Sequence, residues 1–189
     1  MDVTSLSGKT VLVTGAASGI GAAVARRMAA DGATVLAVDL DGAGVKALAR
    51  DVPGVEPIVC DLSDLDAVDA LSAEVDVLVN NAGLQHVAPV HEFDPARFSQ
   101  ILTIMLEAPF RLARMCLPAM YEQGWGRVVN ISSVHGVRAP HWSSRIAWTR
   151  RPKSSRASVC RARTERGPLT PVASPRARVP GRRRGCGPR

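Results

Sequence analysis

Residues 10–21 read Thr10-Val11-Leu12-Val13-Thr14-Gly15-Ala16-Ala17-Ser18-Gly19-Ile20-Gly21. An apolar run ends at Gly15, and small apolar residues at helical spacing follow Gly21, so this order predicts a strand, a tight turn and a helix. Gly15 permits a backbone conformation that a Cβ disfavours, and Gly19 and Gly21 let the helix begin close to the strand and to a ligand. The unpaired N–H groups of the helix terminus then suit a pyrophosphate, whereas the alternative is an ordinary glycine turn without a ligand.

Asp39 favours the pyrophosphate interpretation. It ends a second apolar segment, residues 34–38, and follows Gly21 by 18 residues. A carboxylate about 20 residues beyond the glycines is placed to accept hydrogen bonds from an adenosine ribose. It would also repel a 2′-phosphate, so the sequence predicts NAD and not NADP as the cofactor. The alternative role for Asp39 is the N-cap of a helix that begins near Gly42.

Charge divides the chain near Trp142. Residues 142–189 hold 14 basic residues and one acidic residue, whereas residues 1–141 hold 10 basic and 16 acidic residues. The length of 189 residues suits one domain with a substantial core. Four scattered cysteines without metal-ligand spacing predict reduced thiols and no metal site. Without a signal peptide or an apolar run of about 20 residues, the protein is expected to be cytoplasmic and not to span a membrane.

Apolar segments and helical patterns alternate along the first part of the chain. Strands are expected at residues 11–13, 34–38, 57–60, 75–79 and 127–131, and helices at residues 22–29, 45–50, 65–73 and 94–123. The last helix begins with Asp94 as N-cap before a proline, and it should bend at Pro109, where a hydrogen bond is lost. The alternation predicts an α/β fold, a doubly wound parallel sheet of the Rossmann type.

Four motifs occur in a fixed order: Thr14 to Gly21, Asp61-Leu62, Asn80-Asn81-Ala82-Gly83 and Asn130-Ile131-Ser132-Ser133. With these motifs, residues 7–141 resemble the short-chain dehydrogenase/reductase family. Within that family, Gly83-Leu84-Gln85-His86-Val87-Ala88-Pro89 and Ser132-Ser133-Val134-His135-Gly136 resemble bacterial D-3-hydroxybutyrate dehydrogenases. The resemblance implies hydride transfer between NAD and a secondary alcohol, foremost the pair 3-hydroxybutyrate and acetoacetate.

The resemblance also assigns roles to individual residues. Ser133 matches the serine that hydrogen-bonds the reacting oxygen; the alternative is a serine that pairs with loop backbone. The implied cofactor-binding residues include Gly15, Ser18, Gly19, Ile20, Gly21 and Asp39. Asp61 and Leu62 match the pair that flanks the adenine, and Asn80, Ala82 and Gly83 match the turn that packs on the cofactor. Gln85 and His135 match positions that bind the substrate carboxylate, which suits them because an amide and an imidazole both donate hydrogen bonds. Their alternative is a pair of solvated loop residues.

Two catalytic groups of the family are missing. Its general acid/base is a tyrosine followed four residues later by a lysine, a pair expected near Ile146 and Arg150. The single tyrosine of the chain is Tyr121, on the long predicted helix, where we expect a packing role. Met105 stands where many members of the family have an asparagine. The chain is therefore expected to be catalytically impaired.

Residues 142–189 are rich in Arg, Pro, Ser, Ala and Gly without sustained periodicity, so we expect a disordered basic tail and an incomplete fold. One interpretation is a tail that binds nucleic acid; the interpretation that we favour is translation out of frame. The codons CGT-ATC-GCG-TGG-ACA-AGG would encode residues 145–150 and contain, in another frame, TAT-CGC-GTG-GAC-AAG for Tyr-Arg-Val-Asp-Lys. That frame has the missing pair at its proper spacing. Losing the normal continuation would leave the strand at residues 127–131 as an exposed edge.

The sequence thus predicts an NAD-binding domain at residues 1–141 and a tail at residues 142–189. The predicted activity is that of an impaired NAD-dependent dehydrogenase for a small hydroxy acid or another secondary alcohol. Three alternatives remain: another short-chain alcohol dehydrogenase, a non-catalytic nucleotide-binding remnant, and a protein that binds nucleic acid through its tail. The resemblance implies a homo-tetramer, which the missing C-terminal helices oppose. Membrane and nucleic-acid partners are not expected.

Overall fold

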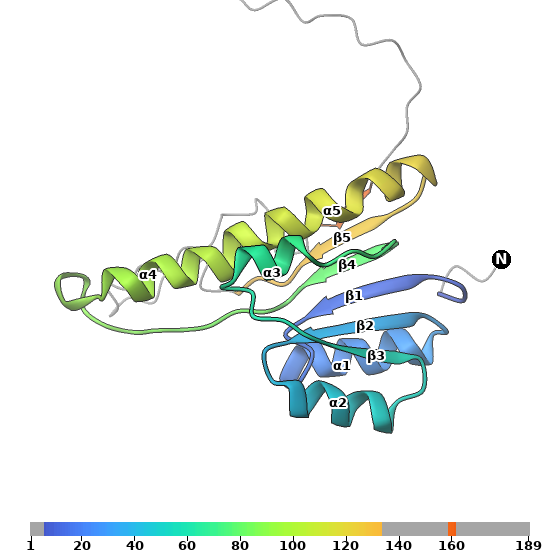
Figure 1. Ribbon diagram of the computed structural model, residues 1–189, viewed down its shortest axis with the longest axis horizontal. Coiled ribbons are helices and arrows are strands. Elements are labelled where there is room, and N and C mark those ends of the chain that lie inside the picture. Colours follow the sequence, from blue (N-terminus) through green and yellow to red (C-terminus); the bar gives the residue numbers. More distant parts are fainter. Residues whose placement is uncertain (1–5, 134–158, 162–189) are drawn as a thin grey trace, which may run out of the picture.

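A six-stranded sheet forms the middle layer of the protein, in the order β3-β2-β1-β4-β5-β6 (Figure 1). The computed structural model describes residues 6–133 and 159–161. The strands are β1 (Thr10–Thr14), β2 (Thr34–Asp39), β3 (Val55–Val59), β4 (Val77–Asn80), β5 (Arg127–Asn130) and β6 (Val159–Arg161). Strands β1 to β5 are parallel, and β6 pairs antiparallel with β5. The predicted doubly wound parallel sheet is confirmed.

Both faces of the central strands are buried. Val11 and Val13 of β1 belong to one core cluster, and Leu12 between them belongs to the other. Strand β4 shows the same alternation, with Val79 on the first face and Leu78 on the second. Because helices cover each face, these strands consist of continuous apolar runs instead of alternating apolar and polar residues.

Two pairs of helices cover the two faces of the sheet (Figure 1). Helices α1 (Gly19–Ala30) and α2 (Gly42–Asp51) contribute Ala25 and Val45 to the first cluster. Helices α3 (Leu65–Asp69) and α5 (Ala108–Glu122) pack on the second cluster, where α5 buries Leu112 and Cys116. An ion pair between Arg111 and Asp69 joins α5 to α3. No helix in the described part of the chain is long and apolar enough to cross a membrane.

The long helix expected at residues 94–123 is divided into α4 (Pro95–Leu102), the π-helical segment η2 (Thr103–Glu107) and α5. Pro109 has no N–H to donate to the carbonyl oxygen of Met105, four residues earlier. The backbone widens immediately before it, so that the Ala108 N–H donates to the carbonyl oxygen of Thr103, five residues earlier. The helix is thus irregular in η2, which ends two residues before Pro109, where a bend was expected. A single 3₁₀ turn, η1 (Val90–Glu92), lies in the loop before α4.

Several helix ends differ from the expected ranges, including that of α1, which begins at Gly19 and not at residue 22. Helix α2 begins at Gly42, three residues early, because Asp41 Oδ1 accepts hydrogen bonds from the N–H groups of Ala43 at 3.1 Å and Gly44 at 3.0 Å. Helix α3 ends at Asp69 although the apolar spacing extends to residue 73. Leu71 and other apolar residues of that extension pack against the second cluster from a loop, so their spacing reflects burial and not a helix.

Strand β6 modifies the expected edge of the sheet. It pairs with β5 in the register Arg127↔Arg161 and Val129↔Val159, so the edge that we expected to be exposed is covered over three residues. An edge strand presents unpaired N–H and C=O groups, and an extended segment satisfies them. The other residues of the expected tail, like the boundary near residue 141, lie outside the described residues.

Candidate functional site

The carboxyl ends of β1, β2 and β4 meet at one edge of the sheet, where the strand order reverses. From β1 the chain continues to β2 and β3 on one side, while β4 and β5 lie on the other side. In open parallel sheets this reversal leaves a crevice outside the strand ends, in which ligands bind. The glycine turn of residues 15–21, Asp39 and the turn of residues 80–83 all leave the sheet at this edge. The fold therefore brings the predicted cofactor segments together.

The glycine turn sets how closely α1 approaches β1. Gly15 has a φ of +68° and Gly19 a φ of +54°, both in the left-handed region that glycine adopts without strain. A Cβ on Gly21 would lie 2.0 Å from the carbonyl oxygen of Gly15, so only glycine lets the helix begin this close to the strand. This close approach is what a bound dinucleotide requires of the turn.

The first turn of α1 is open to an anion. Ser18 is the N-cap residue, yet its hydroxyl caps no first-turn N–H within the described ranges, and that turn contains no acidic side chain. Ser18, Gly19 and Ile20 are all exposed, Ile20 with 62% of its surface. The first-turn N–H groups and the positive end of the helix dipole suit a pyrophosphate.

Asp39 is held beside the glycine turn. Its Oδ2 accepts a hydrogen bond from the Ala17 N–H at 2.9 Å, and its Oδ1 accepts one from the Asp41 N–H at 3.0 Å. The N-cap of α2 is Asp41, so the alternative role of Asp39 as that cap is wrong. An ionised carboxylate has about four acceptor positions. Two of these acceptor positions are therefore left for the hydroxyl groups of a ribose.

Asp61 and Leu62 follow β3 at the same edge. Asp61 Oδ1 accepts hydrogen bonds from the N–H of Ser63 at 2.8 Å and from its hydroxyl at 2.7 Å, which orders the turn. Leu62 is buried in the second core cluster, which leaves its backbone as the part that can touch a ligand. Burial, and secondly the charges of Asp61 and Asp64, raise the pKa of the Cys60 thiol next to this pair. A raised pKa disfavours the thiolate, which is the reactive form of cysteine.

Asn80, at the end of β4, connects that strand to β5. Its Nδ2 donates to Asn130 Oδ1 at 2.9 Å, and its carbonyl oxygen accepts from the Ile131 N–H at 2.9 Å. Asn80 is buried, and its Oδ1 has no hydrogen-bond partner among the described residues. Its side chain thus holds the end of β5 in place, three residues before Ser133.

Asn81 and Thr14 are two site residues that sequence reasoning did not select. Asn81 Nδ2 donates to the carbonyl oxygens of Thr14 at 3.0 Å and Gly15 at 3.2 Å. Thr14 Oγ1 accepts hydrogen bonds from the N–H groups of Asn81 and Ala82, both at 3.0 Å. These four bonds join the glycine turn to the turn after β4. Both residues stand at strand ends within the quoted motifs, but the motifs alone do not show that they meet.

Of the residues predicted to face the substrate, Gln85 and Ser133 lie within the described residues. Gln85 and Ser133 are both exposed. The rings of His86 and Phe93 meet edge to face at 5.1 Å, and those of Phe93 and Phe98 at 6.2 Å, so the loop that carries Gln85 packs against α4. His135, and positions 146 and 150 where the family has its tyrosine and lysine, lie outside the described residues.

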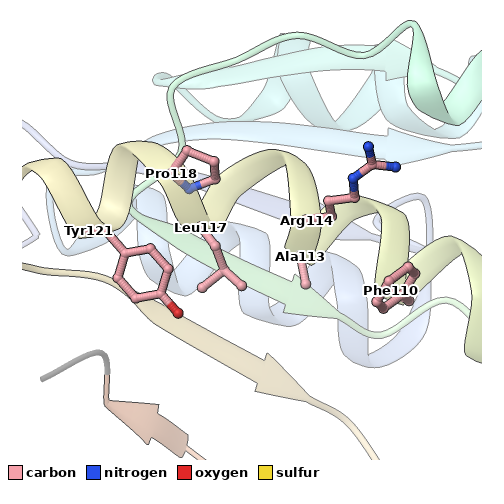
Figure 2. A pocket seen from close by; sticks show the side chains of 6 residues that line it. All are labelled: Phe110, Ala113, Arg114, Leu117, Pro118 and Tyr121. Carbon is pink, nitrogen blue, oxygen red and sulfur yellow. The ribbon is translucent and has the colours of Figure 1, made fainter. Parts of the chain in front are cut away.

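An open apolar hollow lies apart from these residues, on α5. Its lining residues all come from that helix: Phe110, Ala113, Arg114, Leu117, Pro118 and Tyr121 (Figure 2). Tyr121 is 55% exposed, so the packing role that we expected for it is wrong. None of the predicted cofactor or substrate residues lines this hollow.

Comparison with known proteins gives matches in both sequence and structure. A family model described as short chain dehydrogenase matches residues 9–145. D-beta-hydroxybutyrate dehydrogenase of Cupriavidus necator is 38% identical over 145 residues, which are 71% of this chain and 56% of the relative. D-threitol dehydrogenase of Mycolicibacterium smegmatis is 40% identical over 139 residues, 68% of this chain and 54% of the relative.

A solved structure shares the fold. It is a metagenomic short-chain oxidoreductase in complex with NADP, with a TM-score of 0.67 and 37% identity, covering 70% of this chain and 65% of that protein. The chain spans just over half the length of the curated relatives it matches. The matched part contains β1, β2 and β4 and the turns that follow them.

Proposed function

We propose, because this chain belongs to the short-chain dehydrogenase/reductase family, that it has an NAD(H) site and descends from a 3-hydroxybutyrate dehydrogenase but is catalytically impaired. The observation that carries the cofactor site is the contact of Asp39 with the glycine turn, since it places a carboxylate next to an open helix N-terminus. Bound at this place, the nicotinamide would accept or supply a hydride. The residues of the chain bind it, orient it and hold the substrate.

The preference for NAD over NADP rests on Asp39. A carboxylate accepts hydrogen bonds from the 2′- and 3′-hydroxyl groups of a ribose, and it repels a 2′-phosphate. The solved relative named above contains NADP, so family membership itself does not specify the cofactor. Gly15, Ser18, Gly19, Ile20 and Gly21 would hold the pyrophosphate. Asp61 and Leu62 would flank the adenine, and Asn80, Ala82 and Gly83 would support the nicotinamide half.

The proposed substrate is 3-hydroxybutyrate or its oxidised partner acetoacetate. Ser133 would donate a hydrogen bond to the reacting oxygen, while Gln85 and His135 would bind the carboxylate through N–H groups. One relative is a D-beta-hydroxybutyrate dehydrogenase, which supports this choice, and another is a D-threitol dehydrogenase, which makes other secondary alcohols the second candidate.

Impaired catalysis follows from the absent tyrosine and lysine. The chain has one tyrosine, Tyr121, and it lies exposed on α5 and not among the site residues. Losing a positioned acid/base costs about 10²- to 10⁴-fold in rate. We attribute residues 142–189 to a shifted reading frame, because the alternative frame supplies Tyr-Arg-Val-Asp-Lys near residue 146. A cytoplasmic location remains a prediction.

The family's homo-oligomer is the proposed assembly only in part, because the C-terminal helices that complete its tetramer are expected to be missing. Phe110 and Tyr121 on α5 are exposed by 66% and 55%. A row of large apolar side chains of this kind suits contact with a second copy, as the tetramers of the family imply. Sedimentation of the purified chain tests this, and a strictly monomeric chain would contradict it.

Two measurements test the proposed function. Titration of the full chain with NADH and NADPH, followed by nicotinamide fluorescence or calorimetry, should show tighter NADH binding. Assays with NAD and D-3-hydroxybutyrate should show little or no turnover, whereas a protein with the frame restored from about codon 142 should be active. Equal affinity for both cofactors would remove Asp39 from its role, and rapid turnover by the unmodified chain would remove the impairment. A restored protein active only on another alcohol would reject 3-hydroxybutyrate.

A further inference from the structure

Met105 contacts the turn that is expected to support the nicotinamide half of the cofactor. Its Cε lies 3.5 Å, and its Sδ 3.9 Å, from the position that a Cβ on Gly83 would occupy, so the thioether covers this glycine. Met105 is nevertheless 43% exposed. The side chain therefore lies beside the turn after β4 and still has free surface for a ligand.

Met105 belongs to the π-helical segment that precedes α5. Segment η2 (Thr103–Glu107) takes five residues in its turn, which displaces its side chains around the axis relative to those of a regular α-helix. Ile104 remains packed against the second core cluster, while Leu106 points to solvent with 64% of its surface exposed. Between these two residues, Met105 is the side chain of the segment that lies against Gly83.

The order of strands gives the direction in which a dinucleotide would run. The adenosine end belongs at Asp39 after β2, and the pyrophosphate belongs at α1 after β1. Because the sheet order is β2-β1-β4-β5, the rest of the ligand extends towards the ends of β4 and β5, where Gly83 and Ser133 lie. Met105, in contact with Gly83, is at this nicotinamide end.

We propose that Met105 is a further binding residue for NAD(H), with its thioether packed against the nicotinamide ring. This proposal rests on the NAD(H) site proposed above. A thioether is apolar, polarizable and flexible, and it makes favourable contacts with aromatic rings. Such a contact would also exclude water from one side of the ring, and it needs no proton transfer by Met105.

The test compares two ligands that differ in the nicotinamide ring alone. NADH and ADP-ribose share the adenosine, the pyrophosphate and the second ribose, so a ring contact affects only NADH. In the full chain, Met105→Ala should weaken NADH binding by about 3- to 10-fold, the range expected of a sulfur–aromatic contact. The affinity for ADP-ribose should change less than about twofold. Met105→Leu, which retains apolar bulk, should recover most of the NADH affinity.

Leu106→Ala is the matched control, because it removes the exposed neighbouring side chain of the same segment. It should leave both affinities unchanged. Unchanged NADH affinity in Met105→Ala, or an equal loss for NADH and ADP-ribose, would overturn the role of Met105, since equal losses indicate a general change of the turn. If the unmodified chain bound neither ligand, the NAD(H) site itself would be rejected, so the two failures are distinguishable.

Discussion

Asp39 Oδ2 accepts a hydrogen bond from the backbone N–H of Ala17 over 2.9 Å, which joins the end of β2 to the glycine turn after β1. The same carboxylate orders the start of the α2 connection through the Asp41 N–H. Asp39 therefore has a structural contact and a proposed ligand contact in one side chain. Substitutions at this position have to separate the two.

Replacing Asp39 should change cofactor preference more than stability. Asp39→Ala should weaken NADH binding about tenfold or more, because hydrogen bonds to a charged group contribute about 1.5–3 kcal/mol. NADPH should lose much less, because the variant no longer repels its phosphate. Fluorescence titration gives both affinities, and Asp94→Ala, which removes the N-cap of α4, serves as a control with unchanged preference. An unchanged NADH to NADPH ratio in Asp39→Ala would contradict the assignment.

Replacing Gly21 and replacing Gly19 by alanine should destabilise the protein to different extents. In Gly21→Ala the new Cβ would lie 2.0 Å from the Gly15 carbonyl oxygen, so backbone must move, with an expected loss of about 1–3 kcal/mol and of NADH binding. In Gly19→Ala no described atom lies within 4 Å of the Cβ, and only the strain of a positive φ remains, about 1 kcal/mol. Urea unfolding should rank Gly21→Ala as the less stable variant. The opposite order would show that α1 does not approach β1 this closely.

The four hydrogen bonds that join Thr14 and Gly15 to the turn at Asn81 and Ala82 should behave as one network. Asn81→Ala removes two donors to backbone carbonyls, and Thr14→Val leaves the N–H groups of Asn81 and Ala82 without their acceptor. Each single variant should lose about 1–3 kcal/mol of unfolding free energy. The double variant should lose less than the sum, with a coupling of about 0.5–3 kcal/mol. Additive losses in urea unfolding would show that the two residues act independently.

Stability should fall at alkaline pH because of Cys116. This residue is fully buried on α5, and burial raises the pKa of its thiol to about 12. In the unfolded chain the thiol has a pKa of about 8.5, so above that pH the unfolded state loses a proton that the folded state retains. The contribution of the protonated Cys116 thiol to the free energy of unfolding is complete below the unfolded pKa. It is lost as the pH rises towards the folded pKa, by up to about 1.4 kcal/mol per pH unit.

Urea unfolding of the unmodified chain and of Cys116→Val, at several pH values between about 8 and 11, measures this contribution. Lysine and tyrosine titrations are common to both proteins, so the difference in slope isolates the thiol. The unmodified chain should show the steeper decline. Parallel slopes would mean that Cys116 becomes accessible without unfolding.

Local patterns were sufficient for the five parallel strands and for the positions of the turns that follow them, but not for β6. The apolar run of β1 is continuous because helices cover both faces, and Gly15 and Gly19 stand where the backbone takes a positive φ. Both features can be read from a short segment. The run of apolar residues shows that a strand is buried on both faces, and the residue type decides which φ angles are allowed. The same patterns were insufficient for helix ends. Asp41, and not Asp39, caps α2, because a cap depends on where the backbone turns.

The sequence by itself determined that a strand, a glycine turn and a helix would form, and that an acidic residue would end the next strand. Only the tertiary structure decided that Asn81 hydrogen-bonds the Thr14 carbonyl, 67 residues away, and that Met105 covers Gly83. The first pairing depends on the register of β4 against β1, in which Val77 lies opposite Val11. The second brings a residue of η2 to the turn after β4. Contacts of this kind arise when separate segments pack on one sheet, and the local preferences of neither segment specify them.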